Sequence, residues 1–352
     1  MTQLFLDGSK LLHHIPRVSD WIEKKEIFPI HVEISPSSGC NQRCILCCVD
    51  YKKHKPGFLN RNVLLSLADD FAKYGVKSYL LAGEGEPLLN KHVPEFVQKC
   101  FSLGVDGALN SNAVLMNKDI AEKVLPCLTW ARFTVQSPYS DDYCQIHGTN
   151  SRDYELALKN IEYAVYIKKK LKLDVTIGIQ QILINENYDQ VYDNAVLAKK
   201  LGVDYFTVKR FSKHPENSYD VPEDLYKKSK EQFEKCDSLT DDSFSSIVRW
   251  NQFEGQCIRN YKKCIGLPFI TQVLADGSIS PCCMFFDDKS RNYGNLNEHS
   301  FSEIWLSDNK KKIMKYIENN VSVQDCMTYC RHHSTNIFLW QFMEKPSHIN
   351  FI

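Results

Sequence analysis

Four cysteines stand within nine consecutive positions of the sequence, in the stretch SSGCNQRCILCCVDY over residues 37–51. Cys40, Cys44 and Cys47 form the pattern CxxxCxxC, and Cys48 follows directly. Thiolates are the usual ligands of iron in [4Fe–4S] clusters, and three of them on one loop can wrap such a cluster. Because three ligands leave one iron open, the spacing predicts a cluster at which a substrate or cofactor binds and reacts. The alternatives are a zinc knuckle or a redox thiol group, and the overlapping spacing fits poorly with two separated zinc pairs.

Strand-like and helix-like segments alternate around this loop from residue 29 to residue 236. The pattern predicts six strands, each followed by a helix, and therefore a parallel α/β sheet that is either open or barrel-like. The expected strands lie at 29–35, 76–83, 105–112, 130–137, 174–184 and 204–211. The clearest expected helices lie at 62–75, 92–104, 118–128, 153–171 and 188–202.

Polar residues follow several of these strands at the point where each one ends. The cysteine loop follows the first strand, GEGEP (83–87) the second, NSN (110–112) the third, and Ser137 ends the fourth. Chemistry in such sheets is placed at the carboxyl ends of the strands. The sequence therefore predicts one site that collects these residues.

At this point the sequence resembles the radical S-adenosylmethionine (radical SAM) enzymes, whose signature is CxxxCxxC in the loop after the first strand. The resemblance implies a partial (β/α)6 TIM-like barrel and a [4Fe–4S] cluster held by Cys40, Cys44 and Cys47. It also implies that the open iron binds S-adenosylmethionine and that a flavodoxin or ferredoxin-type protein supplies an electron. Cleavage of the cofactor then yields a 5′-deoxyadenosyl radical, which abstracts a substrate hydrogen atom. Leu46 departs from the family pattern, where an aromatic residue is usual.

The same resemblance assigns further residues to cofactor and substrate. GEGEP is similar to the family's GGE element, whose glycines allow close approach and whose carboxylates suit the methionine ammonium group. Lys209 and Arg210 are candidate substrate contacts on the last strand, and Gln180 is expected to face the same cavity. The residues expected to bind the cofactor are Gly83, Glu84, Gly85, Glu86, Asn110, Ser111, Asn112, Ser137 and Gln180.

A second set of cysteines lies in the tail of the chain. The stretch 264–282 resembles the start of SPASM or twitch extensions, with a hairpin that turns at Asp276-Gly277 and a helix over 300–319. The resemblance implies one auxiliary [4Fe–4S] cluster, with structural zinc as the alternative. Cys264, Cys282 and Cys330 are the expected ligands, and the fourth is either Cys257 or Cys326.

Other thiols bear on the outcome of the reaction. Cys48, Cys144 and Cys283 lie near the motifs, and one of them could return a hydrogen atom to a substrate radical, which would make the enzyme an epimerase. An auxiliary cluster that accepts an electron would instead make it a dehydrogenase. Packing is the alternative role for each of the three. Cys100, Cys127 and Cys236 lie in amphipathic stretches and are expected in the core.

Length and composition set the remaining expectations. The chain of 352 residues is read as an N-terminal extension (1–28), a barrel (29–236), a linker (237–256) and an auxiliary cluster domain (257–352). Lys+Arg and Asp+Glu balance at 43 each, which disfavours nucleic acid as a partner. The sequence contains no signal peptide or long apolar run that would suggest a membrane, so a cytoplasmic protein is expected.

The expected function is oxidation or epimerisation of a C–H centre in a small polar metabolite such as a sugar, an aminocyclitol or a nucleotide sugar. Residues 1–28 are too short for a separate peptide-recognition domain, which disfavours a peptide substrate. The alternatives are a peptide-modifying maturase or an activating enzyme that works with a partner protein. A non-catalytic iron–sulfur or zinc scaffold is the alternative from another class.

Overall fold

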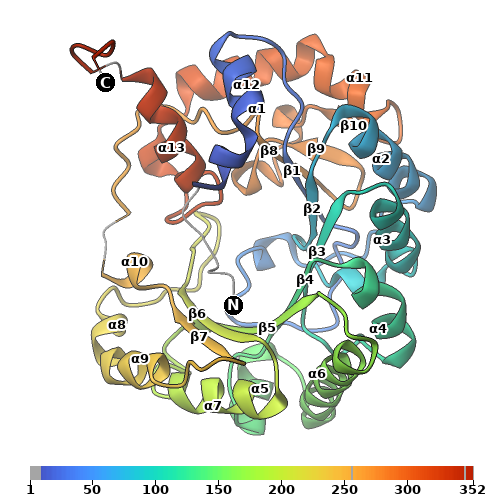
Figure 1. Cartoon of the computed structure of the whole chain (residues 1–352), viewed down its shortest axis with the longest axis vertical. Coiled ribbons are helices and arrows are strands. Elements are labelled where there is room, and N and C mark those ends of the chain that lie inside the picture. Colours follow the sequence, from blue (N-terminus) through green and yellow to red (C-terminus); the bar gives the residue numbers. More distant parts are fainter. Residues whose placement is uncertain (1–8, 255–256, 345, 352) are drawn as a thin grey trace.

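The computed structural model describes residues 9–254, 257–344 and 346–351, and its centre is one curved sheet (Figure 1). Its ten strands run in the order β10-β9-β8-β1-β2-β3-β4-β5-β6-β7. Strands β1 to β7 are all parallel and lie in chain order. The strands are β1 (His31–Ile34), β2 (Ser78–Leu81), β3 (Asp106–Ser111), β4 (Trp130–Thr134), β5 (Thr176–Leu183), β6 (Tyr205–Arg210), β7 (Ser245–Val248), β8 (Ile270–Val273), β9 (Ser278–Ser280) and β10 (Gly294–Asn295).

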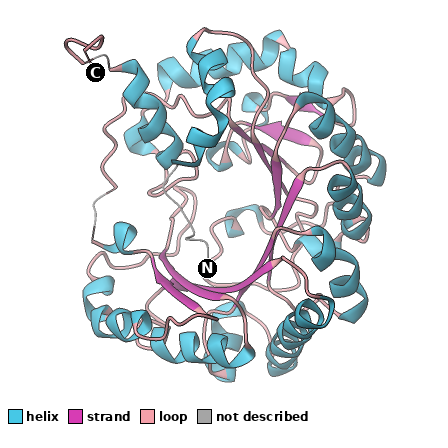
Figure 2. Cartoon of the chain, viewed as in Figure 1, coloured by secondary structure: helices cyan, strands magenta, loops and turns pink. Residues whose placement is uncertain are grey.

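Helices cover the convex, outer face of this sheet (Figure 2). Helix α2 shows why: Leu64, Leu67, Ala68 and Phe71 recur at helical spacing and are all buried on one face. The α-helices are α1 (Ile15–Ile22), α2 (Arg61–Tyr74), α3 (Val93–Ser102), α4 (Lys118–Val124), α5 (Ser140–His147), α6 (Ser151–Leu171), α7 (Val191–Leu201), α8 (Leu225–Lys228), α9 (Lys230–Asp237), α10 (Trp250–Phe253), α11 (Phe301–Leu306), α12 (Asp308–Asn320) and α13 (His333–Met343). The short 3-10 helices are η1 (Ser9–His14), η2 (Asp50–Lys52), η3 (Pro87–Leu89), η4 (Leu125–Cys127), η5 (Cys283–Phe285), η6 (Lys289–Arg291) and η7 (Val323–Asp325).

Side-chain alternation along the strands separates the core from the inside of the barrel. In β4, Ala131 and Phe133 are fully buried, and in β6 the same holds for Phe206 and Val208. These residues belong to the main hydrophobic core with the outer helices, so the residues between them face the concave side. Cys100 and Cys236 are buried in this core and Cys127 packs against it, as the sequence predicts.

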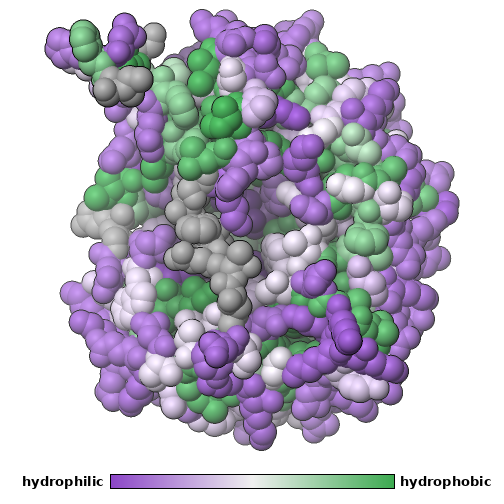
Figure 3. Space-filling model, viewed as in Figure 1, coloured by the Kyte–Doolittle hydropathy of each residue, from purple (hydrophilic) through white to green (hydrophobic). Residues whose placement is uncertain are grey.

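The six predicted parallel strands and the helices between them are confirmed. The predicted tail hairpin is confirmed as β8–β9, with Gly277 in the left-handed conformation at φ +88°. Strand β8 also pairs in parallel with β1, so the tail continues the sheet of the barrel. The face in Figure 3 is largely hydrophilic, with hydrophobic side chains in separate patches.

Two parts of the chain differ from the sequence prediction. The segment 237–256 is not an irregular linker throughout, because β7 lies within it and pairs with β6. The helix expected over 300–319 is divided into α11 and α12, because Ser307 is extended and caps α12 with its hydroxyl. Parts of three predicted segments (residues 1–8, 255–256, 345 and 352) lie outside the described residues. In the described part, every helix is too short or too polar to cross a bilayer.

Candidate active site

Backbone hydrogen bonds hold the CxxxCxxC loop against two neighbouring segments. The amides of Arg43 and Ile45 donate to the carbonyls of His147 and Ile146 at the end of α5, each at 3.0 Å. The amide of Glu86 donates to the carbonyl of Gly39 at 2.9 Å. The loop after β1 is therefore fixed to α5 on one side and to the GEGEP loop on the other.

The three thiols of this loop lie in each other's electrostatic field. Burial raises the pKa of Cys44 to about 12, and the neighbouring Cys40 thiol raises it further. Burial also raises the pKa of Cys47 and Cys40, and both Cys44 and Cys40 add to the shift at Cys47. Thiols grouped in this way become ligands when a cation stabilises their thiolate forms. Among the described residues, no group of three or more His, Cys, Asp or Glu side chains is arranged to hold a single metal ion.

Two histidines contact the cysteines, and neither was identified from the sequence. Nδ1 of His147 lies 3.5 Å from Cys44 Sγ and 2.8 Å from Gln42 Oε1. Its Nε2 accepts a hydrogen bond from the amide of Gln136, which assigns the ring proton to Nδ1. Burial lowers the pKa of His147 to about 3, so the ring is neutral near pH 7. Nε2 of His54 lies 3.4 Å from Cys47 Sγ.

The glycines of GEGEP let its backbone pack against the loop that follows β1. A Cβ atom on Gly85 would collide with the carbonyl oxygen of Gly39, next to Cys40. Gly83 has φ +103°, and a Cβ there would collide with the hydroxyl of Ser35. The two glycines thus bring the second strand end to the cysteine loop, and their predicted contact with the cofactor stays a prediction.

The two carboxylates of GEGEP are both engaged by protein groups. Glu86 is buried and accepts hydrogen bonds from Ser111 Oγ at 2.8 Å, from the Asn112 amide at 2.9 Å and from the Leu88 amide at 3.2 Å. Glu84 pairs with Lys52 Nζ at 2.7 Å and accepts from the amide of Ala275 at 2.8 Å. Glu86 therefore ties β2 to β3, and Glu84 ties the same loop to the tail.

The remaining predicted cofactor residues fall into two groups. Asn112 donates to Asn41 Oδ1 at 2.8 Å, beside Cys40, and Gln180 Oε1 is buried without a hydrogen-bond partner. Asn110 accepts from Arg132 Nε at 3.1 Å, and the Ser137 hydroxyl donates to Gln190 Oε1 at 2.6 Å. The structure thus brings Asn112 to the cysteine loop, whereas Ser137 is engaged with the segment before α7.

The tail cysteines form a second group. The thiols of Cys264 and Cys330 both raise the pKa of Cys282, after burial and Cys283. Cys326 likewise raises the pKa of Cys264 and Cys330. Cys257 Sγ accepts a hydrogen bond from the amide of Tyr329 at 3.3 Å, next to Cys330. The donor set suits an iron–sulfur cluster, and the fourth ligand stays open between Cys257 and Cys326.

The three residual thiols do not lie together. Cys48 and Cys283 pack in one small cluster with Val49, Leu274 and Phe286, and each directly follows a predicted cluster ligand. Cys144 lies on α5 and packs against the main core. The structure therefore brings Cys48 and Cys283 to the same small hydrophobic cluster, against which Cys47 also packs.

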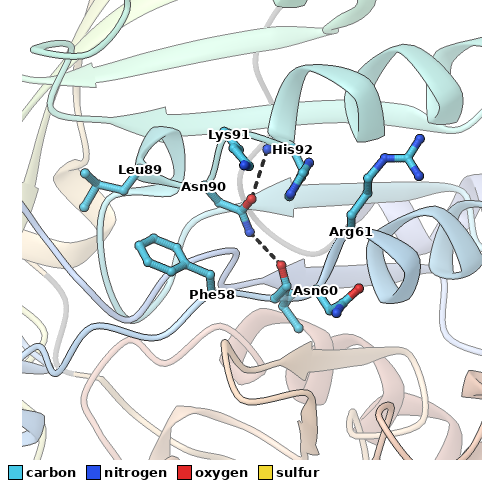
Figure 4. Close-up of a pocket in the computed structure, with 8 residues that line it drawn as sticks. Phe58, Asn60, Arg61, Leu89, Asn90, Lys91 and His92 are labelled. Carbon is cyan, nitrogen blue, oxygen red and sulfur yellow. Dashed lines mark hydrogen bonds between the residues drawn. The ribbon is translucent and has the colours of Figure 1, made fainter.

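A separate pocket lies between the segments 58–61 and 89–92 (Figure 4). Asn90 joins the two segments, donating to the carbonyl of Leu59 at 2.9 Å and accepting from the amide of His92 at 3.0 Å. Its lining contains none of the predicted site residues: Phe58, Leu59, Asn60, Arg61, Leu89, Asn90, Lys91 and His92.

The buried Lys209 side chain is expected to make the stability of the protein depend on pH. Burial lowers the pKa of Lys209 to about 7, and repulsion from Arg249, Arg132 and Arg331 adds to the effect. The unfolded chain therefore binds the proton between about pH 7 and pH 10.5, where the folded chain does not, and stability rises with pH over this window. We expect Lys209→Met to raise the melting temperature of the cluster-free protein at pH 6 and to have a much smaller effect near pH 10. Lys200→Met, at an exposed position of α7, is the control, and an effect of Lys209→Met that is equal at both pH values would contradict the assignment.

Comparison with known proteins gives two family matches. Residues 34–179 match the model of the radical SAM superfamily, and residues 264–332 match that of the SPASM iron–sulfur cluster-binding domain. The first match covers the loop after β1 and the strand ends that follow it, and the second covers Cys264, Cys282, Cys326 and Cys330.

Several characterised proteins are similar to the chain. GTP 3′,8-cyclase of Haemophilus influenzae is 29% identical over 179 residues, which are 49% of this chain and 46% of the cyclase. The chain thus aligns with about half the length of that relative. A tungsten-containing aldehyde ferredoxin oxidoreductase cofactor-modifying protein of Pyrococcus furiosus is 21% identical over 84% of this chain and 85% of its own length.

A solved structure shares the fold over nearly the whole chain. Streptococcus suis SuiB bound to its precursor peptide SuiA has a TM-score of 0.67 at 16% identity, covering 98% of this chain and 80% of SuiB. Together with the two family matches, this establishes the predicted partial barrel with a cluster-binding extension. The chain therefore carries a radical SAM domain and a C-terminal SPASM iron–sulfur cluster-binding domain, and these domains imply a [4Fe–4S] cluster with S-adenosylmethionine and auxiliary iron–sulfur ligation in the tail.

Proposed function

We propose that the enzyme removes a hydrogen atom from a C–H bond of a small polar metabolite and thereby oxidises or epimerises it. Cys40, Cys44 and Cys47 would hold the first cluster, which a flavodoxin or ferredoxin-type protein would reduce. With S-adenosylmethionine bound, that cluster supplies a 5′-deoxyadenosyl radical strong enough to attack an unactivated C–H bond. Polar side chains on the concave side, such as Gln180 and Thr207, have buried oxygens that find no hydrogen-bond partner in the described part of the chain and could orient a polar molecule.

The observation that carries this proposal is the position of Cys48 and Cys283. They pack against the same small hydrophobic cluster, and each directly follows an expected cluster ligand. Burial raises the pKa of both thiols, so each keeps its hydrogen near pH 7. A protonated thiol can donate a hydrogen atom to a carbon radical, and return from the opposite face of the substrate would give epimerisation. The thiyl radical left on sulfur would regain the thiol by taking an electron from the flavodoxin or ferredoxin-type protein and a proton from solvent.

Oxidation is the second outcome and has its own support. Burial, the Cys48 thiol and the Cys330 thiol raise the pKa of Cys283, which supports a position of Cys283 near the expected auxiliary ligand Cys330. A cluster at Cys264, Cys282 and Cys330 could accept the electron that a substrate radical releases when it loses a proton. The product would then carry two hydrogens fewer than the substrate.

The two outcomes can be separated in D2O. The reconstituted enzyme would be incubated without oxygen with S-adenosylmethionine, dithionite and a panel of sugars, aminocyclitols and nucleotide sugars. We expect one class to raise 5′-deoxyadenosine formation clearly above the substrate-free rate. In an epimerase the product gains a solvent deuterium, and Cys48→Ala or Cys283→Ala stops that gain while 5′-deoxyadenosine still forms. In a dehydrogenase the product loses two hydrogens in both variants, and Cys127→Ala serves as the control in each case.

A peptide-modifying enzyme or an activator of a partner protein is the other candidate. The fold is shared with SuiB, which has been solved with its precursor peptide. Peptides therefore belong in the same panel. Stimulation by peptides alone would overturn the proposal of a small metabolite.

A further inference from the structure

Three basic side chains lie on or next to β4, β6 and β7, toward the concave side of the sheet. Arg132 lies on β4, Lys209 on β6, and Arg249 directly after β7. Arg132 and Lys209 alternate with buried core residues, so both face the inside of the barrel. The amide of Arg249 donates to the carbonyl of Val208, next to Lys209, at 3.2 Å, and one strand, β5, separates β4 from β6. Burial lowers the pKa of Lys209, and Arg249 and Arg132 lie near enough to add to that shift. We call Arg132, Lys209 and Arg249 the cationic cluster.

Neighbouring carboxylates do not neutralise the cationic cluster. Glu33 is the nearby acid, but it pairs with Arg331 and accepts from Gln272 Nε2 at 2.6 Å. Among the described residues, no carboxylate forms an ion pair with any member of the cationic cluster. Arg132 Nε donates to the neutral amide oxygen of Asn110 at 3.1 Å, and Nε of Arg249 is buried without a hydrogen-bond partner among the residues that the structure describes.

The strands hold these cations in fixed positions. Arg132 donates to Asn110 Oδ1 at 3.1 Å and lies over the Trp130 ring, with 5.1 Å between Cζ and the ring centroid. The Tyr205 ring packs over Gly178 of β5, where a Cβ atom would collide with it. Burial and mutual repulsion also lower the pKa of Arg249 to about 10. Like charges held this close destabilise the fold unless an anion offsets them.

We propose that the cationic cluster binds a phosphate group of the substrate, so that the small metabolite of the proposed function is a phosphorylated one. This inference rests on the proposed function and names its substrate class. Guanidinium groups match the oxygens of phosphate in paired hydrogen bonds, and two of the three members are arginines. The buried free oxygens of Gln180 and Thr207 lie on the neighbouring strands β5 and β6, where they would meet the uncharged part of the same molecule.

Calorimetry on the full-length reconstituted enzyme tests the site, with inorganic pyrophosphate as the probe. We expect pyrophosphate to bind, to bind more weakly as salt increases, and to be displaced by sugar phosphates or nucleotides but not by their unphosphorylated forms. Arg249→Ala should weaken binding about 10- to 100-fold, the loss expected for a charged hydrogen-bond partner. Lys209→Met should weaken it too, which keeps the test valid if Arg249→Ala fails to fold. Arg61→Ala, which removes an exposed partner of Glu95, is the control.

Three results would overturn the phosphate site. They are unchanged pyrophosphate binding in Arg249→Ala and Lys209→Met, equally tight binding of citrate, and failure of every phosphorylated metabolite to displace the probe. Substrate-free cleavage of S-adenosylmethionine, measured in the same preparations, separates this inference from the proposed function. Cleavage without pyrophosphate binding rejects only the phosphate site, and binding without cleavage rejects only the radical chemistry.

Discussion

Replacing Cys40, Cys44 and Cys47 together by alanine will abolish reductive cleavage of S-adenosylmethionine while the fold persists. The three thiols are the predicted ligands of the cluster that binds the cofactor. The loop itself is held by backbone hydrogen bonds from Arg43, Ile45 and Glu86, which alanine at the cysteine positions leaves in place. The measurement is 5′-deoxyadenosine formation with dithionite, with circular dichroism as the check on folding.

Cys127→Ala provides the matched control for that variant. Cys127 is a half-buried thiol in η4 and packs against the outer core, away from the cysteine loop. Its replacement should leave cleavage intact. Residual cleavage in the triple variant near the wild-type rate would show that other residues hold the cluster.

Glu86→Ala will destabilise the cluster-free protein by about 2–4 kcal/mol, because buried donors lose their acceptor. Glu86 accepts from Ser111 Oγ and from the amides of Asn112 and Leu88, and all three groups are held by the fold. The expected loss of stability is smaller than the summed contributions of three hydrogen bonds. The reason is that burial of the carboxylate is itself unfavourable, and this burial also raises the pKa of Glu86. Urea denaturation without oxygen measures the change.

The comparison for this variant is Glu95→Ala. Glu95 forms an exposed pair with Arg61 on the outer helices, and surface pairs contribute about 0–1 kcal/mol. If Glu86→Ala were no more destabilising than Glu95→Ala, the carboxylate would not be the link between β2 and β3. That result would favour the other predicted role of this carboxylate, which is to interact with the ammonium group of S-adenosylmethionine.

Local patterns in the sequence were sufficient for the barrel strands and for the cysteine loop. Each strand and helix of residues 29–211 carries its own periodicity, and CxxxCxxC is complete within eight residues. Strand β7 was missed because Ser245–Val248 is short and lies in a polar stretch. The division of the tail helix at Ser307 could have been found, since serine before Asp308 is a capping signal.

Residues that act through distant contacts could not be predicted. His147 reaches Cys44 across more than a hundred positions, and nothing in its neighbourhood distinguishes it from a core histidine. Arg132 and Arg249 are single charges in their segments, and it is the order of β4, β5, β6 and β7 in one sheet that brings them near Lys209. The pairing of β8 with β1 is also long-range, and it is what brings Cys283 beside Cys48.

Counting iron is the most direct test of the central claim that this chain holds two clusters on the named thiols. The protein would be purified and reconstituted without oxygen, and iron and sulfide would be measured per chain in the wild type and in the Cys40/Cys44/Cys47→Ala variant. About eight irons falling to about four is the predicted result, one [4Fe–4S] cluster being lost and the tail cluster kept. About four irons falling to none would contradict it, because the tail would then hold no iron–sulfur cluster and oxidation through it would be ruled out.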